Sequence, residues 1–283
     1  MKKIKIKCGE WEAVLYPEYG MNTASLRCGD TSILREAKDD SAFAENLLLY
    51  GIPVIFPANR TKDARFSFEG REYTLPLNEP ERGNNLHGSL YCSEFEVLEV
   101  RESEVISRIV NRGGDYPFPF TLTFTDTVTE AGYRRRAVIT NDGEGNMPYT
   151  FALHSTFAEP KLFTVPIGER YEWDECYIPT GRELPLDDFE RTFHQGCVPD
   201  GREISAPYKA VGCEAVLDSF KLRVSDNFDR WVFYNGNGHE GYLCVEPQCG
   251  DVNGLNTADG HRVLCPGESA VFTFEITSAP GTL

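Results

Sequence analysis

The segment Phe118–Thr125, Phe-Pro-Phe-Thr-Leu-Thr-Phe-Thr, decides the fold class of this chain. Apolar residues occupy positions 118, 120, 122 and 124, while threonines occupy 121, 123 and 125. Successive side chains of a β-strand point to opposite faces, so this alternation predicts a strand with one buried and one solvated face.

The same alternation recurs along the chain and predicts many further strands bounded by turn residues. These segments are 3–7, 11–16, 94–100, 105–110, 134–139, 231–234, 242–245 and 270–276. Glu69-Gly70 separates two alternating runs and predicts a hairpin, because glycine tolerates a positive φ. Helical periodicity covers a turn or two between residues 36 and 48. We therefore predict one all-β domain over residues 1–283, built from two large packed antiparallel sheets.

Charge and composition disfavour several classes of binding partner. The 283 residues include 44 Asp and Glu but only 28 Lys and Arg, a formal charge of −16 that repels nucleic acid and anionic lipid. The chain shows no signal-peptide pattern and no apolar run long enough to cross a bilayer, so we expect a soluble, cytoplasmic protein. Nine irregularly spaced cysteines without a CxxC pair predict reduced thiols and no metal site.

Two motifs have simpler explanations than a binding site. Gly236–Gly241 matches the GxGxxG pattern, but the strand-like run that follows predicts a hairpin loop, since a dinucleotide site needs a helix there. Arg134, Arg135 and Arg136 lie in an alternating strand, which favours a solvated sheet surface over a phosphate clamp.

Four short stretches place polar side chains where strands meet turns, the positions from which side chains enter clefts. They contain Asn59-Arg60, His87, His154 and Glu246. Each stretch alone has an ordinary explanation: a histidine bonded to a backbone carbonyl, a glutamate at a strand end, or a solvated arginine.

Taken in order, Asn59-Arg60, His87-Gly88, His154 and Glu246-Pro247 resemble the motif pattern of the aldose 1-epimerase (galactose mutarotase-like) family. Further matches cover nearly the whole chain: the run from Phe66 to Leu75, Ile178-Pro-Thr-Gly181 and Cys265-Pro-Gly-Glu268. The resemblance implies a β-supersandwich enzyme that interconverts the α and β anomers of a free sugar, with no cofactor.

The resemblance also implies roles for individual residues. Opening a pyranose ring needs a base at the anomeric hydroxyl and an acid at the ring oxygen. By the family's pattern Glu246 is the base and His154 the acid, with His87 hydrogen-bonding near the ring oxygen; an ionised Glu246 beside a protonated His154 is expected. The residues implied to hold the sugar are Arg60, Asn59 and Gln248.

Alternatives remain open. A hexose-phosphate mutarotase would need extra cations, which Arg60 and Arg65 could supply, and a catalytically silent sugar-binding protein or an interaction module could keep the same fold. The family's sugar-binding aspartate in a GYD-like stretch has no clean match; Asp187, Asp188 and Asp218 are the available acids. This departure affects the sugar preference more than the chemistry.

Overall fold

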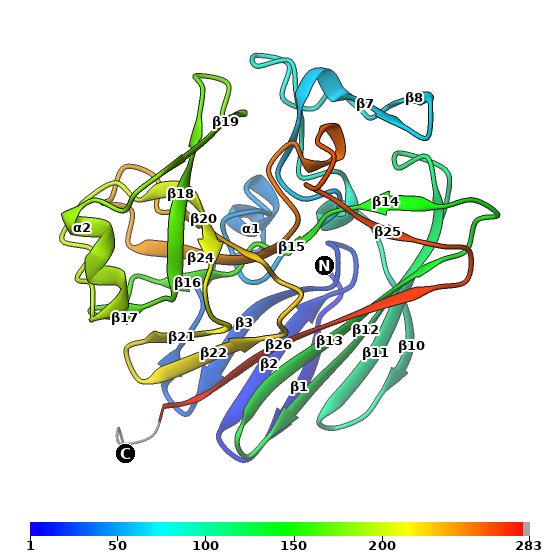
Figure 1. Ribbon diagram of the computed structural model, residues 1–283. Helices are drawn as coiled ribbons and strands as arrows, with labels where there is room; N and C mark the ends of the chain where they lie inside the picture. The colour runs from blue at the N-terminus through cyan, green and yellow to red at the C-terminus, as the bar shows by residue number, and fades with distance from the viewer. Residues whose placement is uncertain (280–283) are drawn as a thin grey trace.

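The computed structural model describes residues 1–279, and two eight-stranded antiparallel sheets dominate it (Figure 1). The order in the first sheet is β10 (Glu96–Val100), β11 (Glu104–Arg112), β12 (Pro119–Thr129), β13 (Gly132–Asn141), β26 (Ser269–Ser278), β22 (Phe220–Val224), β21 (Glu214–Leu217) and β17 (Phe163–Thr164). The order in the second is β19 (Pro179–Leu184), β18 (Ile167–Trp173), β20 (Ser205–Ala210), β23 (Arg230–Tyr234), β24 (Tyr242–Cys249), β15 (Phe151–Leu153) and β5 (Val54–Ile55), with β16 (Thr156–Ala158) also paired to β24. The predicted all-β class is confirmed.

Smaller elements surround these two sheets. The N-terminal sheet of β1 (Ile4–Cys8), β2 (Trp11–Tyr16), β3 (Asn22–Cys28) and β4 (Thr31–Ser32) packs against β12 and β13. Three strand pairs join β6 (Arg60–Thr61) to β9 (Asn85–Leu86), β7 (Arg65–Phe68) to β8 (Arg71–Thr74), and β14 (Met147–Tyr149) to β25 (Arg262–Leu264).

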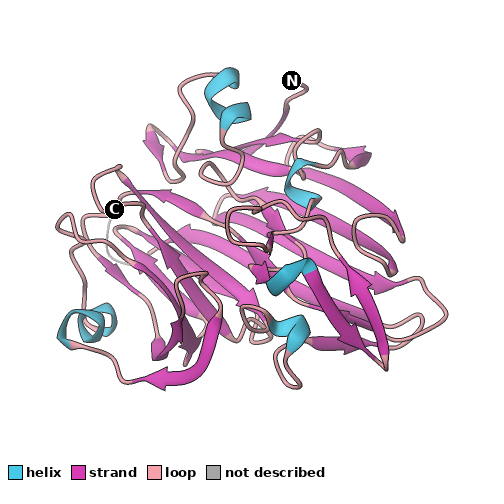
Figure 2. Cartoon of the chain, turned by 90° about the horizontal axis from the view of Figure 1, so that it is seen from above, coloured by secondary structure: helices cyan, strands magenta, loops and turns pink. Residues whose placement is uncertain are grey.

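Helices are few and short among the long strands, as Figure 2 shows. They are α1 (Asp40–Glu45), α2 (Asp188–Arg191) and the 3-10 turns η1 (Lys62–Ala64), η2 (Leu90–Cys92), η3 (Thr192–His194) and η4 (Gly254–Asn256). Within residues 1–279, no helix is long and apolar enough to cross a membrane.

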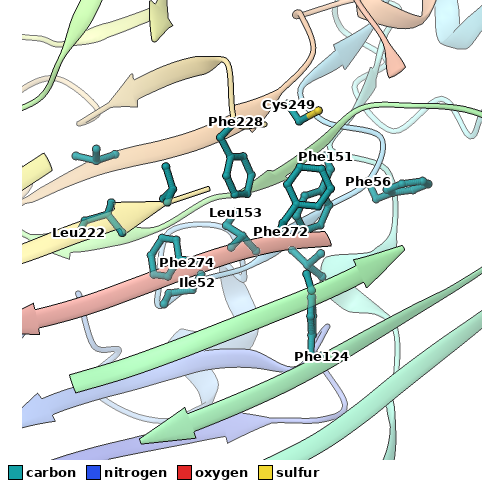
Figure 3. Close-up of a cluster of buried hydrophobic side chains, with 14 of the residues drawn as sticks. Ile52, Phe56, Phe124, Phe151, Leu153, Leu222, Phe228, Cys249, Phe272 and Phe274 are labelled. Carbon is teal, nitrogen blue, oxygen red and sulfur yellow. The ribbon is translucent and has the colours of Figure 1, made fainter. Parts of the chain in front are cut away.

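The core lies between the sheets and follows from the alternation along each strand. In β12, Phe120, Leu122 and Phe124 are fully buried while the threonines between them are partly exposed. Figure 3 shows Phe151 of β15 beside Phe272 of β26, with ring centroids 4.8 Å apart, so side chains from both sheets interdigitate. Each such burial contributes about 1.5–3 kcal/mol.

The strands predicted from alternation are all present, as are the hairpin at Glu69-Gly70 and a short helix, α1. Gly236–Gly241 connects the antiparallel strands β23 and β24, which confirms a hairpin loop. Several strands were not predicted, among them β3, β18, β20, β21 and β22. Strand β19 was also not predicted, because it is a polar edge strand, mostly exposed and paired only with β18, so its sequence does not alternate.

The prediction of a solvated arginine cluster is wrong for Arg135. Arg134 and Arg136 face solvent, but Arg135 is completely buried and pairs with the buried Asp126 at 2.7 Å. Its guanidinium also donates to the Met21 carbonyl oxygen at 2.6 Å, in the turn before β3. Arg135 thus places a charge on the inward face of β13, and its hydrogen bond to Met21 joins the first sheet to the N-terminal sheet.

Candidate active site

Pairing of β6 with β9 brings the first two predicted motifs together. Arg60 is opposite Leu86 in this pair, and the His87 N–H donates to the Asn59 carbonyl oxygen at 2.8 Å. Asn59 and His87 both adopt positive φ angles, 59° and 64°, at the strand ends. Their left-handed backbones turn the chain away from the strands just where the polar side chains occur.

The register of β24 places His154 opposite Glu246. Ala152 of β15 pairs with Gln248, and Thr156 of β16 pairs with Cys244, both on β24. His154 lies midway between Ala152 and Thr156, and Glu246 lies midway between Cys244 and Gln248, so the two residues face each other across this pairing. Their Nε2 and Oε1 atoms lie 3.3 Å apart, although the residues are far apart in sequence.

These residues line one cavity of about 370 Å³ on the face of the second sheet that points away from the core. Its wall includes Asn59, Arg60, His87, His154 and Glu246, so five of the six predicted site residues converge there. Aromatic and polar side chains complete the lining, among them Trp173, Tyr177, Tyr234, Ser205 and Arg82. A hollow with apolar walls and a few convergent polar groups is typical of a small-molecule site.

Burial sets the protonation of the central pair. Desolvation lowers the pKa of His154 to about 4 and raises the pKa of Glu246 well above its ordinary value. Both shifts oppose the expected ion pair and favour a neutral imidazole beside a protonated carboxyl group. The Arg60 charge acts in the opposite direction, because it lowers the Glu246 pKa. In either arrangement the pair carries one proton that it can exchange.

His87 is a neutral hydrogen-bonding group in this cavity. Burial, the neighbouring His154 and Arg60 together hold the His87 pKa well below its ordinary value. The two imidazole rings meet edge to face with centroids 5.3 Å apart. Both Nδ1 atoms are buried without a hydrogen-bond partner among residues 1–279, so each imidazole keeps one unsatisfied polar atom.

Arg60 is held in place by Glu79. Its Nε and NH2 groups donate to the two Glu79 carboxylate oxygens at 2.9 and 2.8 Å, a bidentate pair. Its guanidinium carbon also lies 4.5 Å from the centre of the Tyr177 ring. Burial alone would raise the Glu79 pKa, but hydrogen bonds from Arg60 and Asn84 outweigh it and the pKa is lowered. A charged, fixed guanidinium therefore borders the cavity.

Sequence reasoning missed Glu79, Arg82, Trp173 and Tyr177. Glu79 lies in the polar loop just before His87 and has no strand pattern to mark it. Tyr177 directly precedes the Ile178-Pro-Thr-Gly181 motif, which supports the family resemblance but does not itself indicate a site residue. That motif forms the turn between β18 and β19 and the start of β19, and the turn carries Tyr177 to the cavity.

Gln248 is the predicted site residue that does not line this cavity. Its amide donates to the Gly250 carbonyl oxygen at 2.8 Å, and its side chain borders a separate hollow of about 230 Å³ with Tyr171, Arg230 and Asp251. It shares the sheet face with Glu246 but lies two residues farther along β24.

The three candidate aspartates lie elsewhere in structural roles. Asp187 caps α2, Asp188 pairs with Arg191, and Asp218 accepts a hydrogen bond from the Leu162 N–H. Among residues 1–279, the acids around the 370 Å³ cavity are glutamates: Glu79, Glu81 and Glu246. Arg65 lies in a different groove, of about 800 Å³, that contains neither His154 nor Glu246.

Gly88 directly follows His87 at a position where only glycine fits the backbone and its surroundings. We therefore expect Gly88→Ala to destabilise the protein. A Cβ atom there would lie 1.9 Å from the Phe56 carbonyl oxygen, on a backbone with φ of +62°. Gly83→Ala is the matched control, because φ is +73° but no atom lies within 4 Å. The left-handed backbone costs each variant about 1–2 kcal/mol, and the clash adds to the cost at residue 88 only. Urea denaturation measures the difference, and equal losses would contradict the requirement for glycine at residue 88.

Comparison with known proteins agrees with this architecture. A family model described as aldose 1-epimerase matches residues 2–277. Among curated proteins, "Uncharacterized protein YihR" of Escherichia coli (strain K12) is 24% identical over 145 residues, 48% of this chain. That match spans 47% of the relative, so about half of its length is covered.

Several solved structures share the fold over nearly the full chain. A galactose mutarotase-like protein from Clostridium acetobutylicum has a TM-score of 0.87 at 21% identity, covering 98% of this chain and 95% of that one. An aldose epimerase homologue from C. elegans gives 0.81 at 16% identity, with 98% and 99% covered. A galactose 1-epimerase from Lactobacillus acidophilus NCFM gives 0.80 at 13% identity, with 98% and 94% covered. With the family model matching almost every residue, the chain belongs to the aldose 1-epimerase family.

Proposed function

We propose that this protein interconverts the α and β anomers of a free aldose by general acid–base catalysis. The observation that carries the proposal is the 3.3 Å approach of His154 Nε2 to Glu246 Oε1 in a cavity bordered by Arg60 and His87. Two proton-exchanging groups in one pocket meet the requirement of ring opening and closure. A geometry of this kind supplies roughly 10²- to 10⁴-fold per proton transfer.

The proposed reaction needs no group beyond these side chains. The base takes the proton of the anomeric hydroxyl, the bond between C1 and the ring oxygen breaks, and the acid protonates that oxygen to give the open-chain aldehyde. After rotation about C1–C2, the hydroxyl formed from the ring oxygen attacks the other face of the carbonyl carbon; it gives its proton back to the acid, and the carbonyl oxygen takes back the proton held by the base. The protein ends each cycle as it began, since each group accepts one proton and donates one.

Family resemblance assigns the base to Glu246 and the acid to His154. Burial disfavours charge on both groups, so sugar binding must move the shared proton from the carboxyl group to the imidazole. Arg60 favours this transfer, because its charge lowers the Glu246 pKa. Neutral His87 would then hydrogen-bond the ring oxygen, while Arg60 and Asn59 would hold sugar hydroxyls.

The hexose-phosphate alternative gains no support from the cavity. Of its two expected cations, Arg60 is already paired with Glu79, and Arg65 borders the other groove. Arg82 also lines the cavity, but it is paired with Glu79 and Glu81. We therefore propose a neutral sugar as substrate.

Polarimetry of freshly dissolved α-anomers tests this proposal. We expect the protein to accelerate mutarotation of at least one free aldose more than that of its 6-phosphate. Preference for the phosphate would support the hexose-phosphate enzyme. Sugar binding without acceleration would identify a silent sugar-binding protein instead.

We expect an acid limb near pH 4 in the pH profile of kcat/KM. The active pair carries one proton, and activity falls when His154 takes up a second. Because burial lowers the pKa of His154 to about 4, activity should persist well below the ordinary imidazole value. Loss of the remaining proton gives the basic limb, displaced far above the ordinary carboxyl range because burial raises the Glu246 pKa. An acid limb at about pH 6.5, the free imidazole value, would contradict the buried pair.

A further inference from the structure

Cys244 is a third donor beside the pair formed by His154 and Glu246. It lies two residues before Glu246 on β24, so both side chains point to the same face of the sheet. One donor atom from each of the three residues lies within 4.8 Å of the other two, and all three side chains are buried. The Cys244 thiol also lies 3.4 Å from the Thr156 hydroxyl and does not form part of the cavity wall.

The spacing of His154 and Glu246 suits two ligands of a tetrahedral metal ion, and Cys244 lies close enough to supply a third after a small movement of its side chain. With Zn–N and Zn–O bonds of about 2.0 Å, two ligands of a tetrahedral site lie about 3.3 Å apart. His154 Nε2 and Glu246 Oε1 are separated by 3.3 Å. Three protein ligands leave a fourth position, and His154 and Glu246 both line the cavity, from which an ion can enter.

The chemistry of the donors selects the class of metal. A thiolate and an imidazole favour Zn²⁺ over Mg²⁺ and Ca²⁺, which prefer all-oxygen sites. Bound Zn²⁺ with one thiolate, one carboxylate and a neutral imidazole gives a site of zero net charge. Neutrality matters here because an uncompensated charge in a buried site is costly.

We infer that His154, Cys244 and Glu246 form a Zn²⁺ site that blocks proton transfer when it is occupied. Binding would release two protons, one from the Cys244 thiol and one from the pair of His154 and Glu246. The bound ion then occupies the lone pairs that accept protons from the sugar. The inhibitory part of this inference rests on the proposed function, whereas metal binding does not.

Cobalt(II) tests the site without reference to activity. Co²⁺ substitutes for Zn²⁺, and a cobalt–thiolate bond gives a charge-transfer absorption in the near ultraviolet. We expect one equivalent of Co²⁺ to produce this band in the wild-type protein, and Zn²⁺ but not Mg²⁺ to abolish it. We expect Cys244→Ala to lose the band and to bind Co²⁺ at least about tenfold more weakly, since even outer-shell changes cost about 10- to 100-fold.

Two other cysteines provide matched controls. Cys249 is buried on the same strand but faces the core, and Cys92 is exposed. Cys249→Ala and Cys92→Ser should both keep the band. A band that survives in Cys244→Ala, or no band in the wild-type protein, would overturn the site. Circular dichroism verifies the folding of each variant, and Cys244→Ser serves as a second variant of the same residue.

A mutarotation assay then tests the inhibition. Zn²⁺ should inhibit the wild-type protein reversibly, with recovery on adding a chelator, and Cys244→Ala should need at least about tenfold more Zn²⁺. Equal sensitivity of wild type and Cys244→Ala would overturn the inhibitory role. If the wild-type protein accelerates no sugar, the proposed function fails, while the cobalt titration still decides the metal site.

Discussion

Glu246→Gln is expected to lower kcat/KM for mutarotation by about 10²- to 10⁴-fold, the loss associated with one general catalyst. The amide keeps the size of the side chain but cannot accept or return the proton. His154→Asn should cost a similar factor, because the pair works only when one group accepts a proton while the other donates one. Polarimetry of an α-anomer measures both variants.

The double variant separates cooperation from independent contributions. Groups that act as a unit lose most of their effect when either one is removed, so the double variant should be little slower than the single ones. Multiplied losses would show that the two residues act separately and would contradict the paired scheme.

Controls for this experiment come from the exposed surface. Glu203→Gln and His194→Asn make the same chemical changes at exposed positions and should keep full activity. Glu246→Gln should also melt close to the wild-type temperature, because burial already keeps this side chain neutral in the ligand-free protein. A loss of activity accompanied by unfolding would not support a catalytic role.

Arg135→Met is expected to reduce the free energy of unfolding by about 3–5 kcal/mol. The substitution leaves Asp126 as an unpaired buried charge, and it removes the hydrogen bonds from Arg135 to the Met21 carbonyl and the Thr23 hydroxyl. These bonds join β13 to the N-terminal sheet, so their loss weakens the contact between two sheets. Urea denaturation measures the change.

Two comparisons make this prediction specific. Arg134→Met removes a neighbouring arginine whose bond to Glu275 is largely exposed, and it should cost at most about 1 kcal/mol. Combining Arg135→Met with Asp126→Leu should recover part of the loss, because no buried charge then lacks a partner. Equal effects of Arg134→Met and Arg135→Met would show that the buried pair contributes nothing special.

Local patterns predicted many of the strands, and the family resemblance named most of the residues of the candidate site. Alternation located β12 and its neighbours because a strand that buries one face has an apolar residue at every second position. The motifs around Asn59, His87, His154 and Glu246 named the residues that meet in the cavity, through a resemblance rather than through spacing. The solvated position predicted for Arg135 was wrong. Alternation places Arg135 on the inward face of its strand, and its charge is stable there only because Asp126 is its partner.

The sequence by itself determined the all-β class, the positions of many of the strands and the identity of the polar groups at strand ends. Only the tertiary structure decided that His154 lies opposite Glu246, that Glu79 fixes Arg60, and that Gln248 borders a different hollow. Strand alternation is a local property, with a period of two residues. The register between strands depends on residues far apart in the chain, and so does the exclusion of solvent by packing. These two properties set the distances and the pKa values on which the proposed chemistry depends.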